Sequence, residues 1–162
     1  MIKKRGNKGS IDLSFGMIFS IILIAAIIAV GFYTISYFLN LGKCTEVSLF
    51  YDDFQKAVNR AWNSEIARDE FSGSLPSGIE SVCIGGLNSG NSIFLKEVTE
   101  LRRFRSQNAN TFLYPVKKAC NQAFANIEHI DIEDSFRCFP VVNKKVKIKL
   151  DKGSFDALVK IN

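Results

Sequence analysis

The sequence has few of the residues from which catalytic and metal sites are usually built. It contains one histidine, His129, and its four cysteines lie 39, 37 and 18 residues apart, so no closely spaced pair of metal ligands occurs. Gly85-Gly86 is followed by Leu87, without the lysine and helix start of a phosphate-binding loop. The serine-rich stretch 72–77 lacks a nucleophile-elbow pattern. We therefore expect no metal site, no cofactor, no small-molecule substrate and no enzymatic activity.

Charge is absent from one long stretch of the chain. From Leu13 to Leu39 there are 27 consecutive uncharged residues, which would make a helix of about 40 Å, against ~30 Å for the hydrocarbon core of a bilayer. Four basic residues precede this stretch within 1–9, and no comparable cluster follows it. Because basic flanks stay in the cytoplasm, the pattern predicts a single-pass membrane protein with its N-terminus inside and its C-terminal domain outside.

A cleaved signal peptide is the alternative interpretation of this segment. Ala29-Val30-Gly31 has the small-x-small pattern of a cleavage site. The apolar run before that site is longer than the usual ~7–15 residues, and the run continues to Leu39. We therefore expect a retained anchor and divide the chain into a basic cytoplasmic leader (1–9), a transmembrane helix (10–42) and an extracytoplasmic domain (43–162).

The net charge does not indicate a nucleic-acid partner. The chain carries +5 at pH 7, but residues 1–42 hold four basic side chains and one acidic one, whereas residues 43–162 hold 17 and 15. The external domain thus has an excess of only +2. Its basic cluster at Arg102, Arg103 and Arg105, and the lysines of 144–149, are typical of solvated surfaces. We expect contact with membrane lipid and no binding of nucleic acid.

The even number of cysteines in an exported domain indicates two disulfides. All four follow the apolar stretch: Cys44, Cys83, Cys120 and Cys138. Three pairings are possible, and the sequence does not choose among them. Four buried free thiols are the alternative.

Helical periodicity continues beyond the apolar stretch. Apolar residues recur at spacings of three and four and predict an amphipathic helix over about 44–69. Its buried face is expected to include Val47, Phe50, Phe54, Val58, Ala61, Trp62 and Ile66. Gly42 is the only breaker before it, and a lone glycine need not end a helix.

The rest of the chain predicts strands. Residues 72–78 form an expected loop, with strands at 79–84, 111–114 and 126–132 and a short helix between Phe94 and Phe104. Alternation in 145–150 and 157–161, around Asp151-Lys152-Gly153, predicts an antiparallel hairpin whose last strand is an edge. The fold class is α+β: an N-terminal transmembrane helix that continues into an amphipathic helix packed on a small antiparallel β-sheet.

Lys8-Gly9 lies directly before the apolar segment. In this dipeptide, the long apolar helix and the helix-then-sheet order, the chain resembles type IV pilin-like proteins of the archaeal kind. The resemblance implies a class III signal peptide cut between Gly9 and Ser10, and an apolar helix that remains as an assembly element below a β-sheet head. Many members have glutamate at the fifth position after the cut, where this chain has Ser14.

Small residues within the apolar stretch have the spacing that lets membrane helices approach closely. Gly16 and Ser20 are four residues apart, as are Ala25 and Ala29. They predict a packing seam for a homo-oligomer or filament. The alternative is that small residues are simply common in spanning helices.

Three hypotheses about function follow. The first is a pilin-like structural subunit at the cell surface, processed after Gly9 and assembled through its apolar helix. The second is a permanently anchored, non-polymerising surface module that binds a protein or envelope partner. The third, an enzyme that uses His129 with Asp131 or a reactive thiol, requires a free cysteine in its thiol form.

Overall fold

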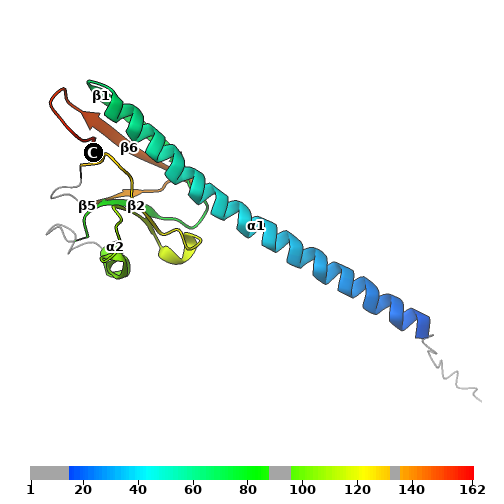
Figure 1. Ribbon diagram of the computed structural model, residues 1–162. Helices are drawn as coiled ribbons and strands as arrows, with labels where there is room; N and C mark the ends of the chain where they lie inside the picture. Colours follow the sequence, from blue (N-terminus) through cyan, green and yellow to red (C-terminus); the bar gives the residue numbers. More distant parts are fainter. Residues whose placement is uncertain (1–14, 88–95, 132–135) are drawn as a thin grey trace, which may run out of the picture. The chain divides into compact units, whose positions relative to one another are not determined.

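The computed structural model describes residues 15–87, 96–131 and 136–162. Contacts divide the chain into two compact units, Met1–Leu39 and Asn40–Asn162. Within the described ranges the fold combines one long helix with two small antiparallel sheets, so the predicted α+β class is confirmed (Figure 1).

The first element is helix α1 (Phe15–Asn63), which continues through Gly42 without a break. It ends six residues earlier than predicted. Ser64 accounts for the end, because its backbone N–H donates to the Ala61 carbonyl and its hydroxyl donates to the Arg60 carbonyl. The Lys152 ammonium then donates to the carbonyls of Trp62 and Ser64, at 2.7 Å each. These bonds satisfy carbonyls that a helix end leaves without partners.

Beyond the helix, strand β1 (Ala67–Ser74) belongs to the first sheet, which has the order β1-β6-β7. β6 (Lys145–Lys152) pairs along the whole of β1, and β7 (Lys160–Ile161) forms the opposite edge. The C-terminal hairpin is therefore confirmed. The expected loop at 72–78 is wrong for residues 72–74, which continue β1 because β6 offers them a full antiparallel partner.

The second sheet has the order β4-β3-β2-β5, with all pairs antiparallel. Its strands are β2 (Ser81–Gly85), β3 (Thr111–Tyr114), β4 (Phe124–Ala125) and β5 (Phe136–Pro140). β2 and β3 confirm two predicted strands. The strand predicted at 126–132 is wrong over 126–131, where only an isolated bridge from Ile130 to Val159 forms, and Ile132 lies outside the described residues.

Short helical elements complete the domain. Helix α2 (Lys96–Leu101) and the 3-10 turn η2 (Arg102–Phe104) fall within the predicted second helix, whose start at Phe94 lies outside the described residues. A second 3-10 turn, η3 (Val116–Lys118), follows β3. It leads into the loop between η3 and β4, here named the Cys120 loop.

The main core lies between α1 and the two sheets. Val47, Phe50, Phe54 and Val58 are almost completely buried, and Phe54 lies 5.1 Å from the Phe71 ring of β1, centroid to centroid. The predicted helix face is thus confirmed over 47–61. It is wrong for Ile66, which follows the helix and is 61% exposed, and for Trp62, which is 37% exposed.

A second, smaller core explains why β2 is buried along its whole length. Val82 and Ile84 face the main core, whereas Cys83 packs with Phe112, Phe136 and the α2 residues Val98 and Leu101. A strand covered on both faces is apolar at successive positions instead of alternating. β6 has one buried face and one lysine face, as its alternating sequence predicts.

Candidate functional site

The apolar surface of α1 is the most extensive exposed feature of the described chain. Over 15–41 its large apolar side chains are 43–85% exposed, whereas in a core helix of a soluble protein they would be buried. The helix is long and apolar enough to cross a membrane, a property that it shares with signal sequences. Among the described residues, the structure thus supports one candidate membrane span.

Two hydroxyl groups along this surface are satisfied within the helix. The Ser20 hydroxyl donates to the Gly16 carbonyl and the Thr34 hydroxyl to the Val30 carbonyl, both at 2.8 Å. Such bonds remove hydroxyl groups that would otherwise lack a partner in lipid. Gly16, Ser20, Ala25 and Ala29 all lie on the exposed helix, and their role as a packing seam stays a prediction. Gly9 and Ser10 lie outside the described residues.

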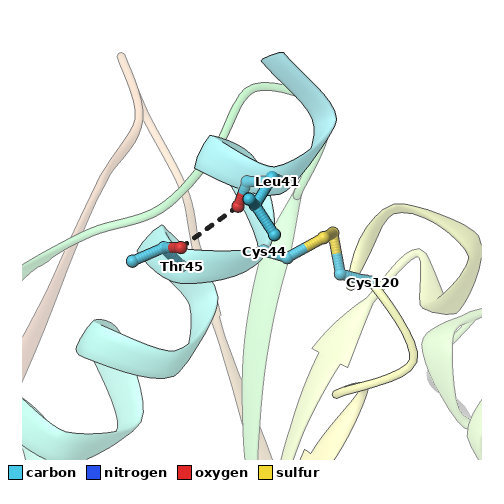
Figure 2. Close-up of a disulfide and its surroundings, with 4 residues drawn as sticks. All are labelled: Leu41, Cys44, Thr45 and Cys120. Carbon is cyan, nitrogen blue, oxygen red and sulfur yellow. Dashed lines mark hydrogen bonds between the residues drawn. A yellow bond between two sulfur atoms is a disulfide. The ribbon is translucent and has the colours of Figure 1, made fainter. Parts of the chain in front are cut away.

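The first disulfide joins α1 to the loop after η3. Cys44 pairs with Cys120, with Cα atoms 5.3 Å apart (Figure 2). Two helical turns later, the Tyr51 hydroxyl donates to the Gln122 carbonyl at 3.0 Å. Burial of the Tyr51 phenol raises its pKa well above the ordinary value, which keeps it a neutral donor. The Cys120 loop is therefore held to the same helix face covalently and by a hydrogen bond.

The second disulfide joins neighbouring strands of the second sheet. Cys83 of β2 lies opposite Cys138 of β5 in the antiparallel register, and its side chain is fully buried in the smaller core. The two predicted disulfides are thus present, with one of the three possible pairings. No cysteine remains free, so the thiol that the enzyme hypothesis requires is not provided by this arrangement.

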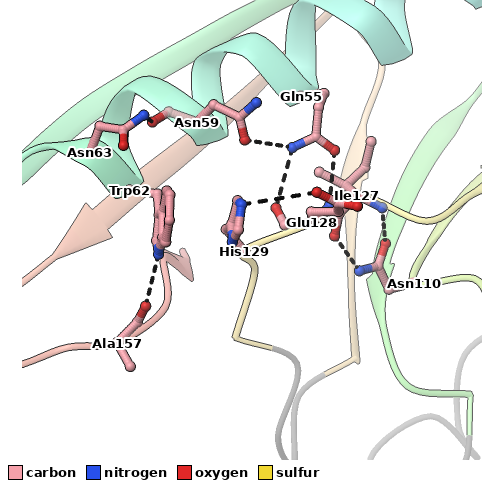
Figure 3. Close-up of polar contacts among 9 residues, drawn as sticks. All are labelled: Gln55, Asn59, Trp62, Asn63, Asn110, Ile127, Glu128, His129 and Ala157. Carbon is pink, nitrogen blue, oxygen red and sulfur yellow. Dashed lines mark hydrogen bonds and ion pairs between the residues drawn. The ribbon is translucent and has the colours of Figure 1, made fainter.

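His129 belongs to a cluster at the C-terminal end of α1. Its ring stacks on Trp62 with centroids 3.8 Å apart and planes 6° from parallel (Figure 3). The Trp62 indole N–H donates to the Ala157 carbonyl at 3.1 Å. Val159 N–H donates to the His129 carbonyl at 2.9 Å. The stack therefore joins the helix end to two loops.

Amides extend this cluster along α1. The Glu128 N–H donates to the Gln55 side-chain oxygen at 2.9 Å, and the Gln55 amide donates to Asn59 at 2.8 Å (Figure 3). Buried Asn110 exchanges two hydrogen bonds with the backbone of Ile127. Hydrogen bonds from side-chain amides thus hold Ile127 and Glu128, where a strand was predicted over 126–132. These contacts follow neither helical nor strand periodicity, so the sequence pattern could not indicate them.

The arrangement around His129 is typical of a packing cluster. The Glu128 carboxylate lies 4.0 Å from His129 Nε2, an exposed contact, and His129 has a left-handed backbone with φ of 67°. Among the described residues, no group of three or more histidine, cysteine or acidic side chains is arranged to hold a metal ion. Catalysis by His129 with Asp131, the third hypothesis, stays untested, and the absence of enzymatic activity stays a prediction.

Two of the surface grooves in the described part of the head are candidate binding sites. The larger, about 620 Å³, lies between α1 and β1 and is lined by charges of both signs, including Asp53, Arg60 and Asp69. The other, about 450 Å³, is formed by η2, η3 and the Cys120 loop. Arg103 and Lys117 are its charged lining residues. The arginine cluster singled out in the sequence thus contributes one side chain to a groove.

No known protein family, curated protein or solved structure matches this chain. The assignment of function therefore rests on the residues and on the geometry described above.

Proposed function

We propose that the chain is a membrane-anchored, extracytoplasmic structural subunit of the type IV pilin-like kind. It is processed between Gly9 and Ser10 and assembles with other copies through its apolar helix. Its partners are membrane lipid and further copies of the same chain, and it needs no cofactor.

The observation that carries this proposal is the change of environment along α1. One helix contributes exposed apolar side chains over 15–41 and the central core residues of the head over 47–61. No loop separates the two parts. A helix that both anchors a head and forms its core is the arrangement that the resemblance implies for such subunits.

The disulfides support an external location for the head. Disulfides persist in oxidising compartments and are rare in the cytosol of most organisms. Both lie after the apolar stretch, as expected if the basic leader stays in the cytoplasm. The small-residue pairs Gly16/Ser20 and Ala25/Ala29 lie on opposite sides of the helix at 100° per residue. Each pair provides a place where the helix of a neighbouring copy packs closely.

N-terminal sequencing and intact-mass measurement of the protein from native membranes test the processing step. We expect a chain that begins at Ser10. Gly9→Val should abolish this cleavage, because the resemblance implies a leader that ends in Lys-Gly. Gly6→Val, another glycine of the leader, should leave the new terminus at Ser10. A native chain that begins at Met1 would contradict the proposal.

A permanently anchored, non-polymerising surface module is the second candidate. The observation that favours it is Ser14, which replaces the glutamate that many pilin-like proteins have for assembly. Shearing of cells and sedimentation of the released filaments separate the two candidates. The subunit is expected in the filament fraction, whereas a permanent module stays with the membranes.

A further inference from the structure

The groove formed by η2, η3 and the Cys120 loop combines a basic rim with an apolar floor. Arg103 and Lys117 form the rim, and Phe104, Val116 and Phe124 line the interior. The rings of Phe104 and Phe124 have centroids 4.9 Å apart, and the Arg103 guanidinium lies 5.0 Å from the Phe104 centroid. Exposed cations beside half-buried apolar side chains fit a ligand with one anionic end and one apolar end.

One acidic side chain lies near the rim. Glu100 approaches Arg103 to 3.8 Å, and it also accepts a hydrogen bond from the Val116 N–H at 3.2 Å. Glu100 does not line the groove. Lys117 has no such neighbour among the ion pairs of the described residues, and the rim therefore keeps an excess of positive charge.

Covalent connectivity limits how far this groove can lie from the end of the apolar stretch. Cys44 is five residues after Leu39, which is about 8 Å along a helix. The headgroup layer of a bilayer is about 5–8 Å thick on each side. Cys120 is bonded to Cys44 and lines the groove, so only five residues and one disulfide connect the groove to the end of the apolar stretch.

We propose that this groove binds the phosphate headgroup of an anionic phospholipid in the outer leaflet. Arg103 and Lys117 contact the phosphate, and Phe104, Val116 and Phe124 contact the glycerol and the first methylene groups. The disulfide and the Tyr51–Gln122 hydrogen bond hold the Cys120 loop of this groove to the residues of α1 that follow the apolar stretch. The inference rests on the proposed membrane anchoring and applies to the subunit while it resides in the membrane.

Photo-crosslinking in vesicles tests this site with the full chain. Zwitterionic vesicles receive a trace of phospholipid that carries a diazirine near its glycerol, with either an anionic or a zwitterionic headgroup. Peptide mass spectrometry then locates the adducts. We expect adducts at 103–104 and 116–124, with a preference for the anionic probe of about fivefold or more, as expected for one or two basic side chains at a surface.

Two double variants make the test specific. Arg103→Gln with Lys117→Gln should abolish the preference. Lys145→Gln with Lys149→Gln, which removes two exposed lysines of β6, should retain it. Lys118 is left unchanged because its side chain packs over Gly78: a β-carbon built on this glycine would lie 3.4 Å from the Lys118 side chain. Its substitution could therefore disturb packing. Circular dichroism and a disulfide map check that every variant is folded.

The outcomes separate the site from the anchor. The proposal is supported if the chain floats with the vesicles that carry either probe and if the anionic probe gives the higher adduct yield at 103–104 and 116–124. Flotation with equal adduct yields for the two probes, or a preference that survives the rim variant, overturns the lipid site and leaves the anchoring intact. A chain that fails to float with either vesicle contradicts the proposed function itself.

Discussion

Trp62 and His129, 67 residues apart in the sequence, stack face to face with ring centroids 3.8 Å apart. The stack occupies the end of α1, where a fully buried tryptophan is predicted from helical spacing. Trp62 is 37% exposed. Its contribution to the stability of the head therefore comes from the stack on His129 and the hydrogen bond to Ala157 as much as from burial. This relationship changes the expected effect of substitutions there.

Trp62→Ala should lower the free energy of unfolding by about 2 kcal/mol, less than the ~3–5 kcal/mol of a fully buried aromatic residue. Trp62→Phe keeps a ring and should lose about 1 kcal/mol with the indole hydrogen bond. Urea unfolding of the full chain in detergent measures both. Phe155→Ala, at a fully exposed aromatic residue, is the control and should change stability by less than about 0.5 kcal/mol. Equal losses for Trp62→Ala and the control would show that the stack does not stabilise the head.

Removal of either disulfide should destabilise the head by similar amounts. The bridges close sequence separations of 76 and 55 residues, which correspond to about 4 kcal/mol each in the chain-entropy model. Paired serine variants, Cys44→Ser with Cys120→Ser and Cys83→Ser with Cys138→Ser, avoid a leftover thiol. Their Tm values in non-reducing buffer should fall below that of the wild type. Non-reducing peptide mapping checks the pairing, and a peptide that links Cys44 to Cys83 would contradict it.

Two glycines should respond to alanine in opposite directions. A β-carbon on Gly73 would lie 2.6 Å from Phe50 Cε2 and 2.8 Å from Phe71 Cε1, so Gly73→Ala should cost about 1–3 kcal/mol through overpacking. Nothing lies within 4 Å of the corresponding position on Gly42 in α1. Gly42→Ala should therefore stabilise the helix by up to about 1 kcal/mol. Chemical denaturation of both variants gives the two signs, and destabilisation by Gly42→Ala would contradict the continuous helix.

The Asp156 carboxylate gives a pH-dependent contribution in the C-terminal turn. A hydrogen bond from Lys160 and a second from the Gly153 N–H lower its pKa below the ordinary 3.8. The interaction therefore stabilises the fold above pH 3.8, and this stabilisation is lost as the pH falls through the lowered pKa of Asp156 in the folded state. NMR titration of the carboxyl group should show the low pKa in the wild type. Lys160→Gln should return it toward 3.8, whereas Lys149→Gln should not; an ordinary value in the wild type would contradict the turn geometry.

Sequence patterns predicted those parts of the fold that depend on neighbours along the chain. The alternation of Val146, Ile148 and Leu150 with lysines specifies a half-buried strand, and the spacing of Phe50, Phe54 and Val58 specifies a buried helix face. These patterns reflect periodicities of two and of 3.6 residues, which the backbone imposes locally. The C-terminal end of α1 could not be predicted from periodicity, because residues 67–69 pair with β6, a strand far away in the sequence, and do not extend the helix.

The sequence by itself determined that the chain has one long apolar helix, a lysine-faced C-terminal hairpin and an even set of cysteines for two bridges. Only the tertiary structure decided that Cys44 pairs with Cys120, that Trp62 leaves the core to stack on His129, and that Arg103 and Lys117 border one groove. The physical reason is that the first group follows from local periodicity and composition. The second group depends on contacts between segments far apart in the chain, whose geometry is set by how all the elements pack together.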